Sequence, residues 1–445
     1  MPRDVAPPFG AAGFARRMSG QVLLLVALLV GIRGTALAQA NCSILGQNTF
    51  VHDTLFDIYF WYRELPNTDP ALFGSPEAYL EAVRYRPLDR NFSYILSLAE
   101  AEAFYSDSQF IGIGFSRKQT GPRQLRITQV YPSSPASEAG LERGAYLLTI
   151  GGRPVSELLA NGQLGSALGP NEIGVRVELT WRTVRGETRG AVVTKRPVTI
   201  PTVSDVTVFD LDGLPVGYLH FRNFVRPSIA ALNRAFRQFR ARGVVDVILD
   251  LRYNGGGLVN VGQHLAGLIG GVNTKSKVFV EFFHNDKNAF LNHVSRFRDP
   301  PASADLPRLV VITSQASASA SEMVINGLRP FLPVTTVGDR TFGKPVGQYG
   351  FDFCDKVLFP VSFETRNSLG EGGYFSGLPA DCAATDDLDR LLGDPGEASL
   401  AEALNFLRTG SCSRQAAIAS RSLEQLRRDT GAPEPNGWEQ LLNAW

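Results

Sequence analysis

The chain has 445 residues, and its 44 Lys and Arg residues nearly balance its 43 Asp and Glu residues, for a formal net charge of +1. This length exceeds that of one typical domain and predicts about two to four folded units. A composition that is 44% hydrophobic and 20% charged is typical of globular proteins. The balanced charge and the lack of a basic stripe argue against a nucleic-acid or polyanion partner.

Residues 1–38 have the features of a signal peptide. Arg16-Arg17 precedes an apolar run over residues 22–30, and Ala36-Leu37-Ala38 is a small-x-small cleavage site. The apolar run is too short to span a bilayer, so we expect a protein that does not span the membrane. We predict export to the periplasm or cell envelope, with cleavage after Ala38 or, as a second choice, after Ala40.

The four cysteines, Cys42, Cys354, Cys382 and Cys412, form no C-x-x-C pair, so neither a structural zinc site nor any other metal site is predicted. In an oxidising compartment they predict up to two disulfides. We favour Cys354–Cys382, which would tie the end of the α/β region to its following loop, and keep buried free thiols as the alternative. A lipid anchor at Cys42 is not expected, because Asn41 precedes it where a small residue is required.

The residue pattern changes along the rest of the chain. Helical spacing of apolar and aromatic residues, including Leu55 and Tyr94, predicts a small helical region. Short β segments follow, beginning with 111–115, and then strands alternate with helices as in an α/β core. The tail is helical again, with leucines from Leu388 to Leu407 as its apolar face. The predicted regions are an N-terminal helical region (41–107), a mainly β region (108–200), an α/β core (201–382) and a helical tail (383–445).

The mainly β region resembles a PDZ domain. Gly112-Ile113-Gly114-Phe115 is similar to the carboxylate-binding loop of these domains, and the run from Ser134 to Gly152 is similar to their second half. Consecutive backbone N–H groups in a tight glycine loop form a nest for a carboxylate, and the next strand can pair with an incoming peptide. The resemblance implies that Gly112, Ile113, Gly114 and Phe115 bind the C-terminus of a protein or peptide.

Each of three buried β runs in the α/β core is followed by a loop that contains candidate site residues. Loops at the carboxyl ends of neighbouring parallel strands gather at one edge of a sheet. We therefore expect the glycines, Ser319 and Lys344 to meet there. The runs and their loops are residues 247–249 before Asp250-Leu251-Arg252-Tyr253-Asn254-Gly255-Gly256-Gly257, residues 309–312 before Ser317-Ala318-Ser319-Ala320-Ser321-Glu322, and residues 334–337 before Thr341-Phe342-Gly343-Lys344.

Ser319 and Lys344 form a candidate nucleophile and base. A serine hydroxyl is a weak nucleophile until a base removes its proton, and a lysine can be that base if burial keeps its amine neutral. Glycine backbone can approach a substrate closely and direct an N–H at a developing oxyanion. The pattern predicts a serine–lysine peptidase that needs no metal, nucleotide or other cofactor.

These motifs resemble those of the C-terminal processing (tail-specific) peptidases, in the same order and over nearly all of the mature length. The resemblance implies a crotonase- or ClpP-like spiral α/β core with an inserted PDZ domain and helical N- and C-terminal regions. It implies that Ser319 is the nucleophile, Lys344 the general base and Gln348 the residue that orients the lysine. The N–H groups of Gly257 and Ala320 would form the oxyanion hole.

The activity implied by this resemblance is that of an exported serine endopeptidase. It would recognise proteins or peptides with free C-termini through its PDZ domain and cleave them through an acyl-enzyme. An adaptor or activating protein and a homo-oligomer are both compatible with the resemblance.

Other interpretations of the same residues remain. The serines could cap a helix, and Lys344 alone could be a solvated loop charge. A histidine triad is disfavoured because the histidines, among them His220 and His264, lie outside the motif loops and no G-x-S-x-G elbow occurs. A catalytically silent PDZ scaffold, or a protein that binds a hydrophobic or cell-wall ligand on the same fold, would not need the Ser, Lys and Gln spacing.

Overall fold

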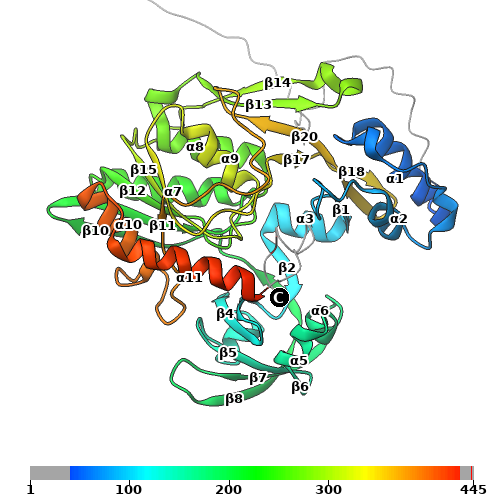
Figure 1. The fold of residues 1–445 in the computed structure, drawn as a ribbon, viewed down its shortest axis with the longest axis horizontal. Helices are drawn as coiled ribbons and strands as arrows, with labels where there is room; N and C mark the ends of the chain where they lie inside the picture. The colour runs from blue at the N-terminus through cyan, green and yellow to red at the C-terminus, as the bar shows by residue number, and fades with distance from the viewer. Residues whose placement is uncertain (1–40, 431–441, 443–445) are drawn as a thin grey trace, which may run out of the picture. The chain divides into compact units, whose positions relative to one another are not determined.

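The N-terminal part of the protein is mostly helical in the computed structural model, which describes residues 41–430 and Leu442 (Figure 1). Ser43, Ser75 and Ser97 each begin a helix by accepting a backbone N–H of its first turn. Tyr94, predicted to be helical, lies instead in a short strand that pairs with a later part of the chain. The elements are α1 (Ile44–Ile58), η1 (Tyr62–Glu64), η2 (Pro70–Leu72), α2 (Pro76–Val83), β1 (Tyr94–Ser97) and α3 (Leu98–Asp107).

A β unit follows, and its main sheet has the strand order β3-β4-β5-β7-β8. Inward side chains such as Phe115, Ile127 and Trp181 are buried in a core of their own. The predicted run 111–115 is divided, because β2 ends at Gly112 and β3 begins at Phe115. The elements are β2 (Gln109–Gly112), β3 (Phe115–Gly121), β4 (Gln124–Val130), α4 (Pro135–Glu138), β5 (Tyr146–Ile150), β6 (Arg153–Pro154), α5 (Val155–Ala160), α6 (Leu164–Leu168), β7 (Arg176–Arg182), β8 (Thr188–Thr194) and β9 (Arg196–Thr199).

The next region is built on a six-stranded sheet with the order β10-β11-β12-β15-β16-β21. The strands from β11 to β21 in this order run parallel to their neighbours, and Leu249 pairs with Val311 while Ile312 pairs with Val337. The three buried runs are therefore neighbouring parallel strands, as predicted. The elements are β10 (Val203–Leu211), β11 (Leu214–Phe221), α7 (Ser228–Ala241), β12 (Asp246–Asp250), α8 (Val259–Thr274), β15 (Leu309–Thr313), α9 (Ala320–Leu328), β16 (Val334–Gly338) and β21 (Cys382–Ala383).

Helices cover both faces of this sheet (Figure 1). Leu249 and Val311 pack with residues of α7, α8 and α9 on one face. Ile248 and Val310 pack with residues of α10 (Ala398–Thr409) on the other face. A strand that is buried on both faces is continuously apolar in sequence, which is why these runs could be recognised.

A second, antiparallel sheet with the order β14-β13-β20-β17 lies beside α9. The N-terminal helices pack close to it: Leu55 and Tyr79 share a core with Val346 and Leu358. The elements of this part are β13 (Val278–His284), η3 (Asp286–Leu291), β14 (His293–Arg296), β17 (Val346–Gln348), β18 (Phe351–Phe353), β19 (Lys356–Phe359) and β20 (Val361–Arg366).

The C-terminal region contains α10 and α11 (Arg414–Thr430), and α11 packs against β21 and against β3. Leu400 and Leu407 lie on the buried face of α10, as predicted. Leu388 and Leu391 were wrongly assigned to a helix, since both precede α10 in irregular backbone, where Leu388 is buried and Leu391 is exposed.

Two disulfides, Cys42–Cys354 and Cys382–Cys412, join the cysteines, with Cα–Cα distances of 5.8 and 5.4 Å. The predicted Cys354–Cys382 pair was therefore wrong. Cys354 lies in the turn between β18 and β19, and its partner Cys42 precedes α1. Cys382 lies on β21, and its partner Cys412 precedes α11. Each pairing depends on tertiary packing, which the spacing of cysteines along the chain does not encode.

The expected α/β architecture with several sheets is confirmed. The crotonase- or ClpP-like core and the PDZ type of the β unit stay predictions. The three boundaries between the four predicted regions stay predictions as well, since the described residues all fall in one compact unit. No described helix is both long and apolar enough to cross a membrane.

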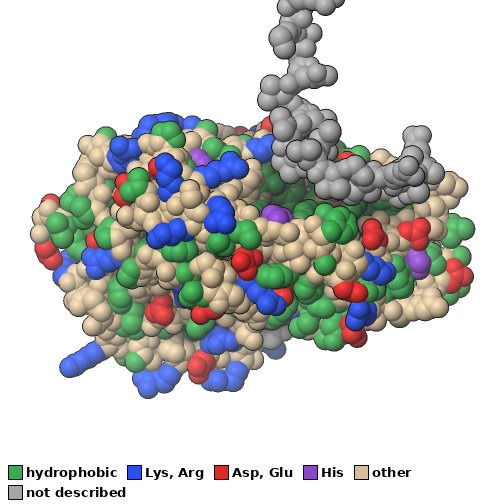
Figure 2. Space-filling model, turned by 90° about the horizontal axis from the view of Figure 1, so that it is seen from above, with side chains coloured by type: hydrophobic (Ala, Val, Ile, Leu, Met, Phe, Trp, Pro, Cys, Tyr) green, Lys and Arg blue, Asp and Glu red, His purple; other side chains and the backbone are tan. Residues whose placement is uncertain are grey.

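On the face shown in Figure 2, basic and acidic side chains are interspersed. The predicted signal peptide lies outside the described residues.

Candidate active site

The loops that follow β12, β15 and β16 meet at one edge of the six-stranded sheet. They line a small cavity of about 20 Å³ together with residues of β17 and β20. Four predicted site residues, Ser319, Lys344, Gly257 and Ala320, share this cavity. The remaining lining residues are mostly apolar: Val259, Met323, Val346, Gly347, Phe363 and Thr365.

Ser319 stands immediately before α9 in a strained backbone conformation. Its φ of 57° and ψ of −114° lie where a residue with a Cβ is rarely found, and such strain occurs mainly at functional sites. The neighbouring serines have structural partners: Oγ of Ser317 donates to the Leu251 carbonyl at 2.8 Å, and Oγ of Ser321 donates to the Asn254 carbonyl at 3.0 Å. Of the three serines, Ser319 is the one that lines the cavity.

The glycine loop after β12 approaches Ser319 closely. Gly256 has a φ of +101°, and a Cβ built on it would lie 2.8 Å from Cβ of Ser319 and 2.9 Å from the nitrogen of Ala320. Gly257 has a φ of +136°, and its Cβ would lie 2.3 Å from the carbonyl oxygen of Phe224. Both positions therefore require glycine. As a result, the backbone of Gly257 and Ala320 lies at the cavity beside Ser319. These are the two residues predicted to form the oxyanion hole.

Lys344 has a buried side chain that is only 8% exposed. Its Nζ donates to Oε1 of Gln348 at 2.9 Å and lies 5.5 Å from the centroid of the Phe92 ring. Burial lowers the pKa of Lys344 from 10.5 to about 8, although the negative charges of Asp89 and Glu322 oppose the shift. With that pKa about one amine in five is neutral at pH 7.4, compared with about one in a thousand for an exposed lysine.

A single buried carboxylate, that of Glu322, connects the serine loop to the lysine loop. Its Oε2 accepts the N–H of Ser319 at 2.9 Å and the N–H of Lys344 at 2.8 Å. Its Oε1 accepts the N–H of Gly343 at 2.7 Å and the hydroxyl of Thr341 at 2.5 Å. Burial raises the pKa of Glu322 despite these hydrogen bonds. No role for Glu322 was predicted from the sequence, although Ser319 and Glu322 have the spacing of a helix capping box.

The N-terminal region supplies one wall of the lysine pocket. The Phe92 ring contacts the amine, and the Phe92 carbonyl accepts a hydrogen bond from Nε2 of Gln348 at 2.5 Å. Gln348 therefore holds Lys344 with its oxygen while its own position is fixed by the N-terminal region. The carboxylate of Asp89, which is also buried, accepts hydrogen bonds from the N–H groups of Phe92 and Ser93 and from the Tyr59 hydroxyl.

A buried polar network connects the glycine loop to the β unit. Arg143, which precedes β5, donates to Asp386 at 3.0 Å and to the hydroxyl of Tyr253 at 2.8 Å. The Tyr253 hydroxyl donates in turn to Asp386 at 2.6 Å, and Tyr253 precedes Asn254 in the glycine loop. Burial alone would raise the pKa of Asp386, but Lys118, Arg143 and Arg252 outweigh it and hold the pKa below its ordinary value. The β unit thus contributes a charged contact to the loop beside Ser319.

The predicted carboxylate-binding residues lie far along the chain from this cavity, in the turn between β2 and β3. Ile113 and Phe115 are buried in the core of the β unit. The carbonyls of Ile113 and Gly114 accept hydrogen bonds from Ala136 and Tyr131, each at 2.9 Å. Gly114 has a φ of +100° and packs on Ser134 so closely that a Cβ would lie 2.1 Å away, so glycine is required there.

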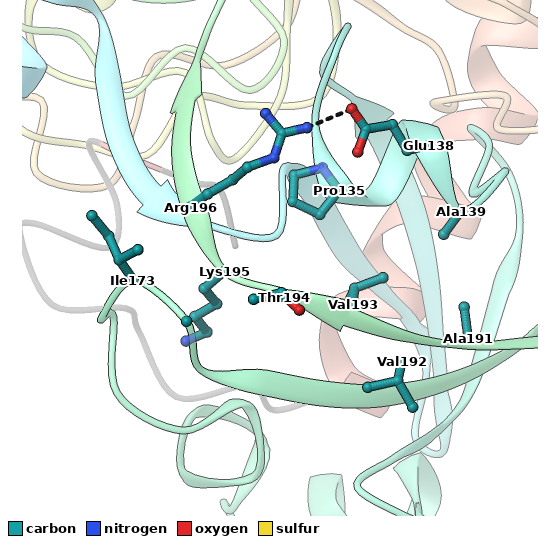
Figure 3. Close-up of a pocket in the computed structure, with 11 residues that line it drawn as sticks. Pro135, Glu138, Ala139, Ile173, Ala191, Val192, Val193, Thr194, Lys195 and Arg196 are labelled. Carbon is teal, nitrogen blue, oxygen red and sulfur yellow. Dashed lines mark hydrogen bonds and ion pairs between the residues drawn. The ribbon is translucent and has the colours of Figure 1, made fainter.

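A larger hollow of about 520 Å³ lies elsewhere on the β unit, between α4 and β8 (Figure 3). Exposed apolar side chains of Ile173 and Val192 border it, and an ion pair between Glu138 and Arg196 closes one side. It contains none of the residues 112–115 and no part of the Ser319 cavity. Its residues carry no candidate nucleophile paired with a base.

The five histidines do not line the Ser319 cavity. His220 is buried beside the carbonyl of Arg252, and His264 on α8 contacts Asn233. In the described part of the chain one group of possible metal ligands comes close together, Cys382, Glu402 and Cys412, and its two sulfurs are bonded to each other.

Comparisons with known proteins cover the residues that line this cavity. Residues 215–366, which include the glycine loop, Ser319 and Lys344, match the family described as "Peptidase family S41". Residues 46–94 match the family described as "Peptidase S41 N-terminal domain". A carboxyl-terminal-processing protease of Synechocystis sp. is 28% identical over 239 residues, which cover 54% of each chain. The chain spans about half the length of the first curated relatives it matches.

Solved structures show the same fold. A putative S41 protease from Bacteroides fragilis has a TM-score of 0.64 at 25% identity, covering 81% of this chain and 97% of that one. The photosystem II D1 C-terminal processing protease has a TM-score of 0.53 at 21% identity, covering 82% of this chain and 98% of that one. With both S41 domains matched in one chain and the fold shared, residues 46–94 and 215–366 of this chain are similar to peptidase family S41.

Proposed function

We propose that the protein is an exported serine endopeptidase that cleaves peptide bonds with a Ser319–Lys344 dyad. The observation that carries this proposal is the shared cavity, where the strained serine and a lysine with a pKa of about 8 lie among apolar side chains. A base with a pKa near the working pH combines a useful neutral fraction with sufficient basicity.

In the proposed reaction the neutral amine of Lys344 takes the proton of Ser319 as the hydroxyl oxygen attacks the scissile carbonyl. The N–H groups of Gly257 and Ala320 donate to the oxyanion. The ammonium of Lys344 then protonates the leaving amine, which leaves an acyl group on the serine. The same lysine deprotonates the water that hydrolyses this ester, and the hydroxyl of Ser319 is restored. Gln348 keeps the amine oriented throughout.

We further propose that the β unit is of the PDZ type and holds the substrate C-terminus at Gly112, Ile113, Gly114 and Phe115. The support is the tight glycine turn followed by β3, which is an edge strand of its sheet and can accept a peptide strand. Helix α11 packs against β3, so it lies next to the strand that would take the peptide. A peptide with a free apolar C-terminus should bind about ten- to a hundredfold more tightly than its amidated copy, because amidation removes the charged acceptor.

Export to the periplasm or cell envelope is supported by the signal-like residues 1–38 and by the two disulfides, which form in oxidising compartments. Cys42 takes part in one of these disulfides and so offers no thiol for a lipid. Cell fractionation followed by N-terminal sequencing tests this: we expect an envelope or periplasmic protein that begins after Ala38.

Turnover of unfolded casein by purified variants tests the dyad. Ser319→Ala and Lys344→Ala should each abolish cleavage, and Lys344→Arg should fail too because a guanidinium does not deprotonate in this pH range. Gln348→Ala should retain part of the activity. Substantial turnover by Lys344→Ala would contradict the mechanism.

Matched controls separate loss of chemistry from loss of structure. Ser422→Ala and Lys275→Ala remove the same functional groups at exposed positions, where the hydroxyl contacts the Ile418 carbonyl and the ammonium contacts Asp299, and both should leave cleavage unchanged. A wild-type chain that binds C-terminal peptides tightly but has no turnover would favour the silent PDZ scaffold instead.

A further inference from the structure

The loop that carries Lys344 is held from two sides by charged groups. Glu322 holds its N–H groups from the catalytic side. The guanidinium of Arg90, in the N-terminal region between α2 and β1, holds its carbonyl groups from the other side. Nη2 of Arg90 donates to the carbonyls of Phe342 at 3.3 Å and Gly343 at 3.1 Å.

These contacts fall on the same two peptide groups. In the Phe342–Gly343 peptide the carbonyl contacts Arg90 and the N–H contacts Glu322. In the Gly343–Lys344 peptide the carbonyl again contacts Arg90 and the N–H again contacts Glu322. Both peptide planes next to the lysine are therefore fixed at both ends, and hydrogen bonds to a charged partner are the stronger ones.

Arg90 also joins a second loop to the first. Its Nη2 donates to the Phe375 carbonyl at 3.2 Å, and this oxygen lies so near Gly343 that a Cβ there would be 2.3 Å from it. Gly343 has a φ of +95°, a conformation that L side chains rarely adopt. The guanidinium thus bridges carbonyls that converge on the turn just before Lys344.

The same guanidinium orders the aromatic groups around the amine. It lies 5.4 Å from the centroid of the Phe92 ring and 5.2 Å from that of Phe342, within the range of cation–π contacts. The two rings meet edge to face at 6.0 Å, and the Phe92 ring also contacts the Lys344 amine. Arg90 therefore stands behind the apolar surface that keeps water from the lysine.

We propose that Arg90 is a positioning residue for Lys344: it fixes the peptide groups on both sides of Gly343 and holds the Phe92 and Phe342 rings over the amine. The proposal rests on the proposed function, in which Lys344 is the general base. Arg90 touches neither the serine nor the cavity, so its effect on the reaction is exerted through the lysine.

The direction of the effect follows from the burial of the amine. Without the guanidinium the loop and the rings loosen and water reaches the amine, which weakens the burial that lowers the pKa of Lys344. The substitution therefore raises the pKa of Lys344 toward that of an exposed lysine.

The test compares Arg90→Met with Arg63→Met in the full chain. Arg63 also connects the N-terminal region to the core, through an exposed ion pair with Asp286 at 2.7 Å, so its replacement removes an arginine from the same region at a site away from the lysine loop. For Arg90→Met we expect kcat/KM for casein at pH 7 to fall at least about tenfold, with recovery toward wild type above pH 9, because each unit of pKa costs about tenfold in neutral amine below the pKa. Arg63→Met should keep the wild-type pH profile, and Arg90→Lys should fall between wild type and Arg90→Met.

A second readout does not require turnover. In Ser319→Ala chains, acetylation of the Lys344 amine by acetic anhydride, measured against pH by mass spectrometry of its peptide, reports the pKa directly. A pKa that rises in the Arg90→Met chain but not in the Arg63→Met chain supports the proposal. An unchanged pKa, or an activity loss of equal size at every pH, overturns it. If Lys344→Ala retains turnover, the dyad fails, yet acetylation still decides whether Arg90 controls the surroundings of the lysine.

Discussion

Replacing Lys344, the proposed general base, by an apolar side chain of similar length should make the protein more stable at neutral pH. Lys344 is 8% exposed, and burial lowers its pKa from 10.5 to about 8, which means that the fold disfavours the protonated amine. At about 1.4 kcal/mol for each pKa unit, this cost is about 3 kcal/mol. Lys344→Met removes the cost and loses the hydrogen bond to Gln348, so we expect a net gain of about 2 kcal/mol at pH 7.

The gain should depend on pH in a defined way. Below pH 8 the lysine is protonated in both the folded and the unfolded chain, so the full cost is present. Between pH 8 and 10.5 the folded chain releases its proton while the unfolded chain keeps it, so the free energy of unfolding of the wild type rises with pH. Above pH 10.5 both states are neutral and the cost is gone, so Lys344→Met should then be about 1 kcal/mol less stable than its parent, because it lacks the hydrogen bond to Gln348.

Urea unfolding between pH 7 and 10.5 measures this difference, with Ser319→Ala in every chain to prevent self-digestion. Lys195→Met is the matched control. Burial lowers the pKa of Lys195 as well, but its ammonium donates to the carbonyls of Gly169 and Pro170 at 3.0 and 2.8 Å, and Lys195→Met leaves both acceptors without this donor, so the fold should be destabilised. A Lys344→Met chain that is less stable than its parent at pH 7, or a difference that does not change with pH, would refute the reasoning.

Three further outcomes are expected from the contacts of the site. Glu322→Gln keeps the shape of the side chain but offers one acceptor oxygen to four donors, so turnover should fall at least about a hundredfold and the free energy of unfolding by about 1–3 kcal/mol; wild-type turnover would show that the two loops do not need this bridge. Arg143→Ala should lower kcat for casein while near-ultraviolet circular dichroism stays unchanged, because the loop beside Ser319 loses its contact with the β unit; an unchanged kcat would mean that this contact is structural only. Cys354→Ser should lower the free energy of unfolding by about 2–5 kcal/mol, and more than Cys412→Ser does, because the first disulfide closes a separation of 312 residues and the second one of 30; equal losses in urea would contradict the chain-entropy explanation.

Much of the site could be predicted because its loops follow continuous apolar strands. Such strands are buried on both faces, parallel and adjacent, so their carboxyl ends meet without further information. This rule was enough to predict that Ser319, Lys344 and the glycines lie together. The positive φ values of Gly256 and Gly257 explain why glycine, and no other residue, stands there.

The missed features depend on contacts between distant parts of the chain. Phe92 lies 256 positions from Gln348 and Arg90 lies 252 positions from Phe342, and no periodicity encodes either approach. The same is true of the disulfides. Tyr94 was misassigned because its spacing suits a helix, while its partner Phe359 draws it into a sheet. Glu322 was visible as a capping residue, but its bonds to the lysine loop follow only from the fold.

The disulfide between Cys42 and Cys354 also makes a covalent ring of most of the described chain. The ring contains the N-terminal wall, the β unit, Ser319 and Lys344. A peptidase is exposed to cuts in its own surface loops, where proteolysis concentrates. Any single cut inside the ring opens it into a linear chain but releases no fragment, since the sulfur–sulfur bond still joins the two pieces. A nicked molecule therefore keeps Ser319, Lys344 and the N-terminal wall of the lysine pocket on one covalent unit, and its two pieces separate on a gel only after reduction.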